Sequence, residues 1–156
     1  MNSNQTASHV LSRQGQRLLQ IGIALVIYSS LFAVAIPNLG SPRIGLSAHT
    51  LSALQSVFLL AQGLLWPRLR LGLGASRVAF WSSLYGTFAI LAAYTIAAVW
   101  GVGTDTIALM GELPHGLTRG SEVQEALIRT VAYSSAPTGL LSYALILWGL
   151  RSRGSE

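Results

Sequence analysis

The chain has 156 residues, of which 51% are hydrophobic and only 10% are charged, and its mean hydropathy is +0.53. Water-soluble domains carry about 25% charged residues, so this composition excludes an ordinary soluble domain. Its hydrophobicity excludes a disordered chain. The absence of cysteine excludes a disulfide, a thiol nucleophile and a cysteine-bound metal. We therefore predict a single integral membrane domain over residues 1–156.

The ten basic residues, all arginine, and the five acidic residues leave four long uncharged stretches: 18–42, 44–67, 78–104 and 130–150. A helix that crosses a bilayer needs roughly 20 mostly apolar residues, and each stretch can supply one. The fold class predicted is thus all-α, a four-transmembrane-helix bundle. Its helices are expected near 18–36, 47–66, 78–100 and 131–150.

The start of the chain also fits a second interpretation. Arg13 and Arg17 precede an apolar run that ends at Ala33-Val34-Ala35, which resembles a signal peptide with a small-residue cleavage site. Signal peptides have an apolar core of about 7–15 residues, and this run is longer. We therefore favour an uncleaved first helix.

The second stretch is the least apolar of the four. It is convincingly apolar only from Val57 to Trp66, so a re-entrant or interfacial segment is the alternative to a full crossing. The fourth stretch contains Pro137, which is expected to kink its helix. Ser121 and Gln124 form a capping-box pattern, so this helix is expected to begin near residue 121, before the bilayer.

The distribution of arginine predicts the orientation. Most arginines fall in the N-terminal segment, the 67–77 loop and the C-terminal tail, whereas the other loops mix arginine with acids. The positive-inside rule then places both termini in the cytoplasm. Because the arginines form no basic stripe, we expect the lipid bilayer and not nucleic acid as a partner.

The candidate acid–base residues gather at one end of the predicted bundle. His49 is the only histidine within a predicted span, and imidazole titrates near neutral pH. The topology places it on the same side as residues Arg43, Ser47, Asp105, Glu112 and Glu125. For each acid the alternative is a solvated outer loop. A metal site that combines His49, His115 and carboxylates lacks any recognised ligand spacing.

Polar side chains also follow one face of the second helix and lines on the third and fourth. Polar groups are costly against lipid, so these faces should turn inward. The plainer interpretation is hydrogen bonding between helices, at around 0.6 kcal/mol per bond.

Several segments resemble the hydroxylaminobenzene mutase family, and the resemblance extends over most of residues 13–151. They are PRIGLSAH at 42–49, GLLWPRLR at 63–70, LYGTFA at 84–89, AAVWG at 97–101 and LWGLR at 147–151. The resemblance implies a multi-pass enzyme of the bacterial inner membrane. Such an enzyme isomerises hydroxylaminobenzene and other arylhydroxylamines to 2-aminophenol and its analogues during nitrobenzene breakdown. It implies no organic cofactor.

This chemistry needs an acid, a base and a pocket that stabilises positive charge. The expected catalytic residues are His49, Arg43, Glu112, Asp105 and Glu125, and the expected substrate-binding residues are Ser47, Gln55, Tyr85 and Trp100. Tyr85 and Trp100 would present aromatic faces to a cationic ring. We expect no cofactor and no metal. The sequence leaves open whether the chain forms a homo-oligomer. The alternatives are a small four-helix membrane carrier or partner subunit, and a haem- or quinone-binding subunit that uses His49.

Overall fold

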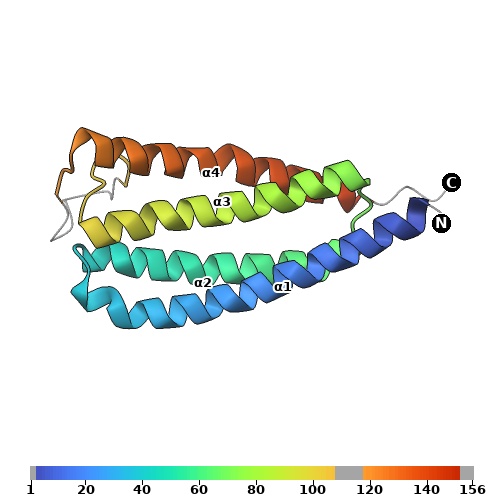
Figure 1. The fold of residues 1–156 in the computed structure, drawn as a ribbon, viewed down its shortest axis with the longest axis horizontal. Helices are drawn as coiled ribbons and strands as arrows, with labels where there is room; N and C mark the ends of the chain where they lie inside the picture. Colours follow the sequence, from blue (N-terminus) through green and yellow to red (C-terminus); the bar gives the residue numbers. More distant parts are fainter. Residues whose placement is uncertain (1–2, 108–117, 152–156) are drawn as a thin grey trace.

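The computed structural model describes residues 3–107 and 118–151, and these ranges form four long α-helices (Figure 1). The helices are α1 (Ser3–Ala35), α2 (Pro42–Leu65), α3 (Leu73–Trp100) and α4 (Glu122–Gly149). Short 3₁₀ helices, η1 (Ile36–Asn38) and η2 (Trp66–Arg68), follow α1 and α2. The all-α fold is therefore confirmed.

Three of these helices are long and apolar enough to cross a membrane: Ser8–Asn38, Pro42–Arg68 and Leu73–Trp100. The second stretch is thus one continuous helix of spanning length. The fourth helix has 28 residues, as many as α3, which at 1.5 Å per residue makes it about 42 Å long. Its polar residues, including Ser134, Ser135 and Thr138, keep its hydropathy below that of the other three.

The helices form an open row and not a closed bundle. Figure 1 shows two antiparallel hairpins, α1 with α2 and α3 with α4, lying side by side along their length. Packing runs from α1 to α2, from α2 to α3 and from α3 to α4, with a sparse approach of α1 to α3. Within the described ranges, no Cα atom of α4 lies within 8 Å of α1 or α2.

Small residues allow α1 and α2 to approach closely. The inward positions of α1 alternate by four and three residues, and they are Leu11, Gly15, Leu18, Gly22, Leu25 and Ser29. A Cβ atom built on Gly15 would lie 2.8 Å from the Gly63 carbonyl oxygen, and one on Gly63 would lie 2.9 Å from the Gly15 carbonyl oxygen. The two backbones therefore meet with no room for a side chain.

Two apolar clusters fill the row, one toward each end. The larger surrounds Trp66, whose fully buried ring meets Phe80 edge to face at 6.2 Å and donates its indole N–H to Gln14 Oε1 at 3.0 Å. The other joins Ile44 and Ile128 to small residues of α3, namely Ala93, Ala97 and Ala98. The smaller cluster brings the start of α2 and the start of α4 against the end of α3.

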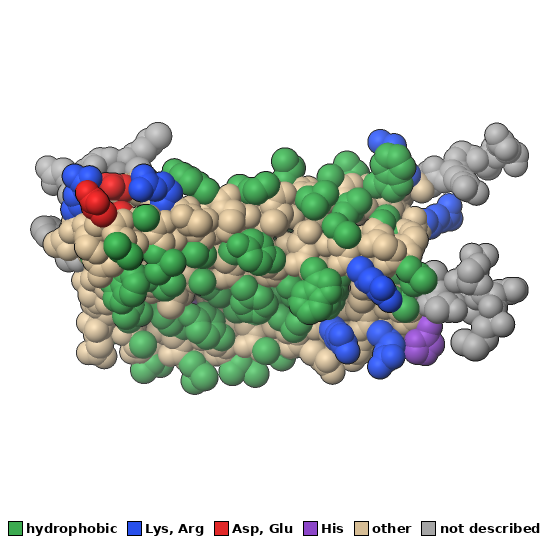
Figure 2. Space-filling view, turned by 45° about the horizontal axis from the view of Figure 1, so that its top comes forward, with side chains coloured by type: hydrophobic (Ala, Val, Ile, Leu, Met, Phe, Trp, Pro, Cys, Tyr) green, Lys and Arg blue, Asp and Glu red, His purple; other side chains and the backbone are tan. Residues whose placement is uncertain are grey.

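The outer surface suits lipid. Figure 2 shows one face on which charged side chains gather at the two ends, with hydrophobic and uncharged surface between them. Large side chains such as Leu31, Val34 and Leu140 are exposed by 69–78%. Soluble monomers rarely expose apolar patches of that extent, so the surface agrees with a membrane protein.

The helix boundaries correct three expectations and confirm one. The first helix begins at Ser3 and not near 18, and the third begins at Leu73 and not near 78. The second helix begins at Pro42 and not near 47, because proline at the first helical position needs no hydrogen-bond acceptor for its nitrogen. The fourth begins at Glu122, which confirms the expected start near residue 121, ahead of the apolar run at 131–150. Its expected capping box is confirmed, since Ser121 Oγ accepts from the Gln124 N–H and Gln124 Oε1 accepts from the Ser121 N–H.

Replacing Gly15 with valine should separate α1 from α2, because its branched side chain has no space against the Gly63 carbonyl. We expect a loss of about 1–3 kcal/mol in stability, the usual cost of overpacking. Thermal unfolding of detergent-purified protein measures it. Gly74→Ala is the matched control, since a Cβ atom there meets nothing within 4 Å. An unchanged Gly15→Val variant would contradict the close packing.

Candidate functional site

The predicted acid–base residues that the structure describes lie toward one end of the molecule but in separate surroundings. His49 and Ser47 lie near the start of α2, whereas Asp105 follows α3 and Glu125 lies in the first turns of α4. Among the described residues, no hydrogen bond or ion pair joins His49 to Asp105 or Glu125. The structure therefore divides the predicted acid–base group. Glu112 lies outside the described residues, as does His115.

His49 is bound to α1 through a single residue. Its Nδ1 atom lies 3.0 Å from the carbonyl oxygen of Ser29 and 3.1 Å from the Ser29 hydroxyl. The same hydroxyl lies 3.2 Å from the His49 carbonyl oxygen, so Ser29 contacts both the ring and the backbone of His49. Ser29 is 3% exposed, and these contacts fix the orientation of the half-buried imidazole.

The contact with Ser29 determines which ring nitrogen carries the proton. A carbonyl oxygen only accepts hydrogen bonds, so Nδ1 must be the donor. In the neutral imidazole, Nε2 then has the free lone pair. No hydrogen bond to Nε2 occurs in the described part of the chain. His49 therefore presents an oriented, unpaired basic nitrogen at the α1–α2 seam.

Glu125 holds the ends of the α3–α4 connection. Its carboxylate is 2% exposed and accepts backbone N–H groups from Gly103 and Gly120 at 2.9 Å each, and from Asp105 at 3.3 Å. Gly103 has a φ of 119°, a conformation that favours glycine. The carboxylate thus joins the segment after α3 to the segment before α4.

These hydrogen bonds govern the ionisation of Glu125. Burial raises the pKa of Glu125, but the hydrogen bonds from Gly120, Gly103 and the neighbouring backbone N–H groups together lower it by more. Its pKa therefore lies below the ordinary value of 4.5. The carboxylate is therefore ionised near neutral pH, and its oxygens already have partners. This arrangement gives Glu125 a structural role that sequence reasoning did not foresee.

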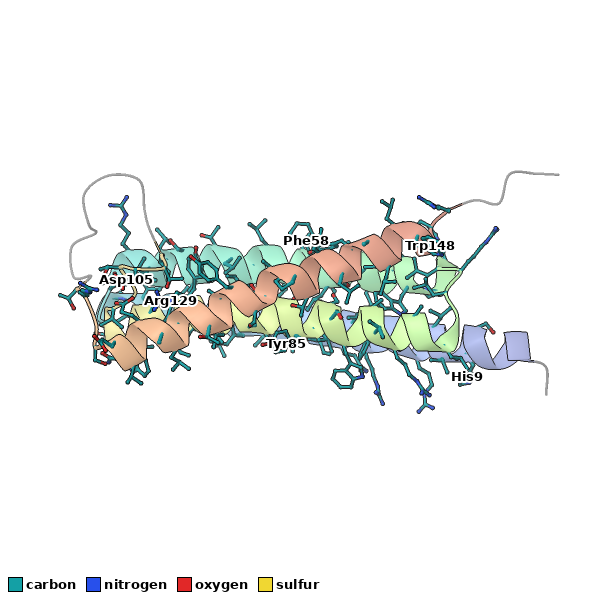
Figure 3. All side chains as sticks on the ribbon, turned by 90° about the horizontal axis from the view of Figure 1, so that it is seen from above. His9, Phe58, Tyr85, Asp105, Arg129 and Trp148 are labelled. Atoms are coloured by element: carbon teal, nitrogen blue, oxygen red, sulfur yellow. The ribbon has the colours of Figure 1, made fainter. Side chains whose placement is uncertain are left out.

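A polar pocket lies beside Glu125 at the same end of the molecule. It has a volume of about 560 Å³ and is lined by Asp105, Arg119, Glu122, Glu125 and Arg129 among others. Figure 3 shows Asp105 and Arg129 together at this end, opposite His9 and Trp148. Asp105 pairs with Arg119 at 3.6 Å, and the arginine is 77% exposed. Exposed pairs of this kind contribute little stability.

A second polar cavity lies between α2, α3 and α4. Its volume is about 240 Å³, and Gln55, Ser83, Thr87, Ser135 and Tyr143 are among its lining residues. Thr87 Oγ1 donates to Gln55 Oε1 at 3.3 Å, which turns Gln55 toward α3, whereas His49 contacts α1. Gln55 and His49 therefore belong to different sites.

The remaining predicted substrate-binding residues do not converge. Tyr85 is 51% exposed on the outer α3–α4 face, where its hydroxyl bonds to Ser134 at 2.8 Å. Trp100 ends α3 and is 44% exposed. Ser47 donates to the Arg43 carbonyl of its own helix at 3.3 Å. None of these contacts brings the four substrate-binding residues into one pocket.

The expectation of no metal stays a prediction. Within residues 3–107 and 118–151, no group of three or more histidine or carboxylate side chains could hold a metal ion. That finding does not extend to Glu112 and His115.

Sequence reasoning missed Ser29 as the partner of His49. Ser29 and Ser30 are adjacent serines in an apolar run, and Ser30 donates to the Val26 carbonyl of its own helix instead. Only the four–three spacing of inward positions on α1, which includes Ser29 and excludes Ser30, could have distinguished them.

Comparison with known proteins gives consistent matches over most of the chain. A family model described as styrene oxide isomerase matches residues 14–151. The chain is 42% identical over 137 residues to hydroxylaminobenzene mutase HabB of Ectopseudomonas oleovorans, covering 88% of this chain and 81% of that protein. It is 26% identical over 133 residues to hydroxylaminobenzene mutase HabA of the same organism, covering 85% and 96%. No solved structure matches.

Replacing Glu125 with glutamine should weaken the α3–α4 connection, because an amide N–H₂ would face backbone donors. Hydrogen bonds to charged groups contribute about 1.5–3 kcal/mol, so we expect a loss of about 2 kcal/mol. The lowered pKa means that the stabilisation is present above pH 4.5 and is lost as pH falls through the folded pKa. Thermal unfolding from pH 7 downward measures it.

The exposed Glu122 provides the control for this measurement. Glu122→Gln should keep the parental fall in melting temperature at acid pH, whereas Glu125→Gln should lose part of it. Equal acid profiles for the two variants would refute the structural role of Glu125.

Proposed function

The chain belongs to the styrene oxide isomerase family, and on that premise we propose that it is a membrane-bound isomerase converting arylhydroxylamines to ortho-aminophenols. The observation that carries this proposal is its 42% identity to a hydroxylaminobenzene mutase over 88% of the chain. Styrene oxide and hydroxylaminobenzene each carry oxygen on a substituent of a benzene ring. Both compounds suit a site reached through lipid.

The proposed reaction is redox-neutral. A proton added to the hydroxylamine oxygen allows the N–O bond to break, with its electron pair leaving on oxygen. The oxygen departs as water and leaves a cationic, electron-poor ring; a water oxygen then bonds to the ortho carbon and loses one proton. Transfer of the ortho proton to the nitrogen restores the aromatic ring, so the product is an isomer of the substrate. The protein must therefore supply and remove a proton and stabilise a cation.

We assign the proton-handling role to His49. Its Nδ1–H group is held by the Ser29 carbonyl, which leaves Nε2 to accept or return a proton. Arg43, Asp105, Glu112 and Glu125 stay candidates from the sequence. Glu125 is the weakest of the described three, because its carboxylate oxygens already accept backbone hydrogen bonds.

The same arrangement favours one alternative, a haem-binding subunit. Histidines that ligate a metal commonly donate their other ring N–H to a carbonyl or carboxylate, as His49 does to Ser29. A visible absorption spectrum of the purified protein tests it. A haem band lost in His49→Gln would replace the cofactor-free mechanism, whereas a spectrum without that band supports it.

We also propose that α4 is a fourth crossing and that both termini are cytoplasmic. α4 lies along α3 over the length of the row, and its C-terminal end lies at the same end of the molecule as the start of α1 (Figure 1). Phosphatase and fluorescent-protein fusions at residues 40, 72, 110 and 156 test the topology. Positions 40 and 110 should report the outside, and positions 72 and 156 the cytoplasm. A cytoplasmic signal at 110 would refute it.

Activity is tested with phenylhydroxylamine and purified protein, with 2-aminophenol as the expected product by chromatography. His49→Gln retains hydrogen bonding but removes titration, so the rate should fall roughly 10²-fold or more. His9→Gln is the matched control, because His9 is exposed at the opposite end of the molecule (Figure 3). Variants are compared as equal amounts of monodisperse protein. A parental rate in His49→Gln would exclude its catalytic role.

The cavity lined by Gln55 is the competing location for the substrate ring. Leucine at Gly139 would project into it, because a Cβ atom there meets nothing within 4 Å. If the ring lies near His49, Gly139→Leu should keep near-parental turnover. A sharply raised KM in Gly139→Leu, but not in the Gly74→Leu control, would move the substrate site to this cavity.

A further inference from the structure

The seam between α1 and α3 contains a long apolar groove. Because α1 packs mainly on α2, α1 and α3 approach each other only sparsely, and a cavity of about 640 Å³ lies between them. Its lining includes Leu25, Tyr28, Phe88 and Leu91. The polar groups of Tyr28 and Thr95 bond to each other at 3.2 Å, so the groove offers little to a polar ligand.

Three arginines surround a second hollow in the same seam. A pocket of about 260 Å³ is lined by Arg13 and Arg17 of α1 and by Arg77 of α3, with Gln14 and Trp81 beside them. The two pockets follow one another along the same two helices, α1 and α3. Arg17 lies one helical turn before Ile21, the first groove residue of α1. Both pockets therefore lie along one pair of parallel helices.

The arginine pocket is rich in donors and lacks a carboxylate. The three guanidinium groups are exposed, and in the described part of the chain Arg119 is the arginine that forms an ion pair. Gln14 is buried with its carbonyl oxygen accepting from Trp66, which leaves its amide N–H groups as donors. Guanidinium groups donate and never accept hydrogen bonds. The pocket therefore has the chemistry of an anion site, and guanidinium groups are well suited to bind phosphate.

The dimensions of the seam match one lipid leaflet. From Arg17 to Tyr28 the helix rises about 16 Å at 1.5 Å per residue, and half of a hydrocarbon core is about 15 Å. Trp81, which is 65% exposed, lies at the level of the arginines, and tryptophan is enriched at membrane interfaces. The arginine pocket thus lies at headgroup level, with the groove reaching toward the bilayer centre.

We propose that the α1–α3 seam binds one anionic phospholipid. Its phosphate lies among Arg13, Arg17 and Arg77, and an acyl chain fills the groove between Ile21 and Tyr28. The charge of the pocket selects an anionic headgroup over a zwitterionic one. The lipid would close the seam that the sparse α1–α3 packing leaves open, so it should also stabilise the folded protein.

Native mass spectrometry tests the proposal on the full chain. The protein is reconstituted in vesicles of phosphatidylcholine with a minority of phosphatidylglycerol, extracted in mild detergent, and its retained lipids are counted. We expect one phosphatidylglycerol per chain and no retained phosphatidylcholine. Arg17→Gln and Arg77→Gln should each lower retention about fivefold, the effect of one cation near an anionic surface. Equal retention of the two lipids would overturn the proposal.

Matched variants separate the seam from general surface charge. Arg68→Gln and Arg70→Gln remove exposed arginines outside the seam and should keep parental retention. Arg17→Lys keeps the charge and should retain most of the binding. Ala92→Phe fills the groove and should release the lipid without touching an arginine. If Arg68→Gln lowers retention as much as Arg17→Gln, the site is only diffuse charge and the proposal fails.

Two further measurements address other occupants. Phosphatidylglycerol should raise the melting temperature of the parent and not of the Arg17→Gln, Arg77→Gln double variant. Inorganic phosphate or glycerol phosphate should leave the melting temperature unchanged, and an equal shift would overturn the role of the acyl chain. The chain has no native cysteine, so Ala24→Cys reports a neighbour in the groove. Its cross-linking to a second copy would likewise overturn the lipid assignment.

Discussion

The hydrocarbon core of a bilayer provides no water, so every backbone N–H and C=O within it must find a partner inside the protein. The helices of this chain satisfy that constraint along most of their length; the exception is Pro137 within α4, which has no N–H for the carbonyl of Tyr133. Their buried serines do the same locally, since Ser52 donates to the His49 carbonyl and Ser135 donates to the Ala132 carbonyl, each within one turn. The irregular backbone after α3 lies at one end, where the Glu125 carboxylate satisfies it. The polar groups that remain for chemistry are few.

The number of helices and their approximate positions could be predicted because charge is so unevenly spaced. Where the prediction missed, local chemistry was stronger than average hydropathy. Pro42 begins α2 five residues earlier than expected, whereas the Ser121 capping box correctly predicted that α4 begins well before its apolar run. The sequence did not predict that the helices pack side by side in an open row, because that arrangement depends on which helix faces fit together. The close approach of Gly15 to Gly63 determines one such contact. Because single glycines are common in membrane helices, the sequence alone does not single out this pair.

The candidate site was predicted only in part, for a related reason. His49 could be singled out as a titratable group in an apolar helix, but its partner Ser29 is twenty residues away and belongs to another helix. Glu125 was grouped with the other acids because charge alone cannot reveal backbone hydrogen bonds. Gln55 and His49 belong to the same helix but contact different neighbours, α3 and α1. A polar stripe along one helix therefore does not define one site.

The open row of helices has a mechanical consequence. Each helix is held mainly by its neighbours in sequence, so the chain behaves as two hairpins joined at the α2–α3 seam. A force applied between the two termini would load all three seams in series, because no contact between α1 and α4 closes the row in the described ranges, and the sparsely packed α2–α3 seam would separate first. In the reverse direction, the local contacts within each hairpin can form before the contacts between α2 and α3 that join the two pairs.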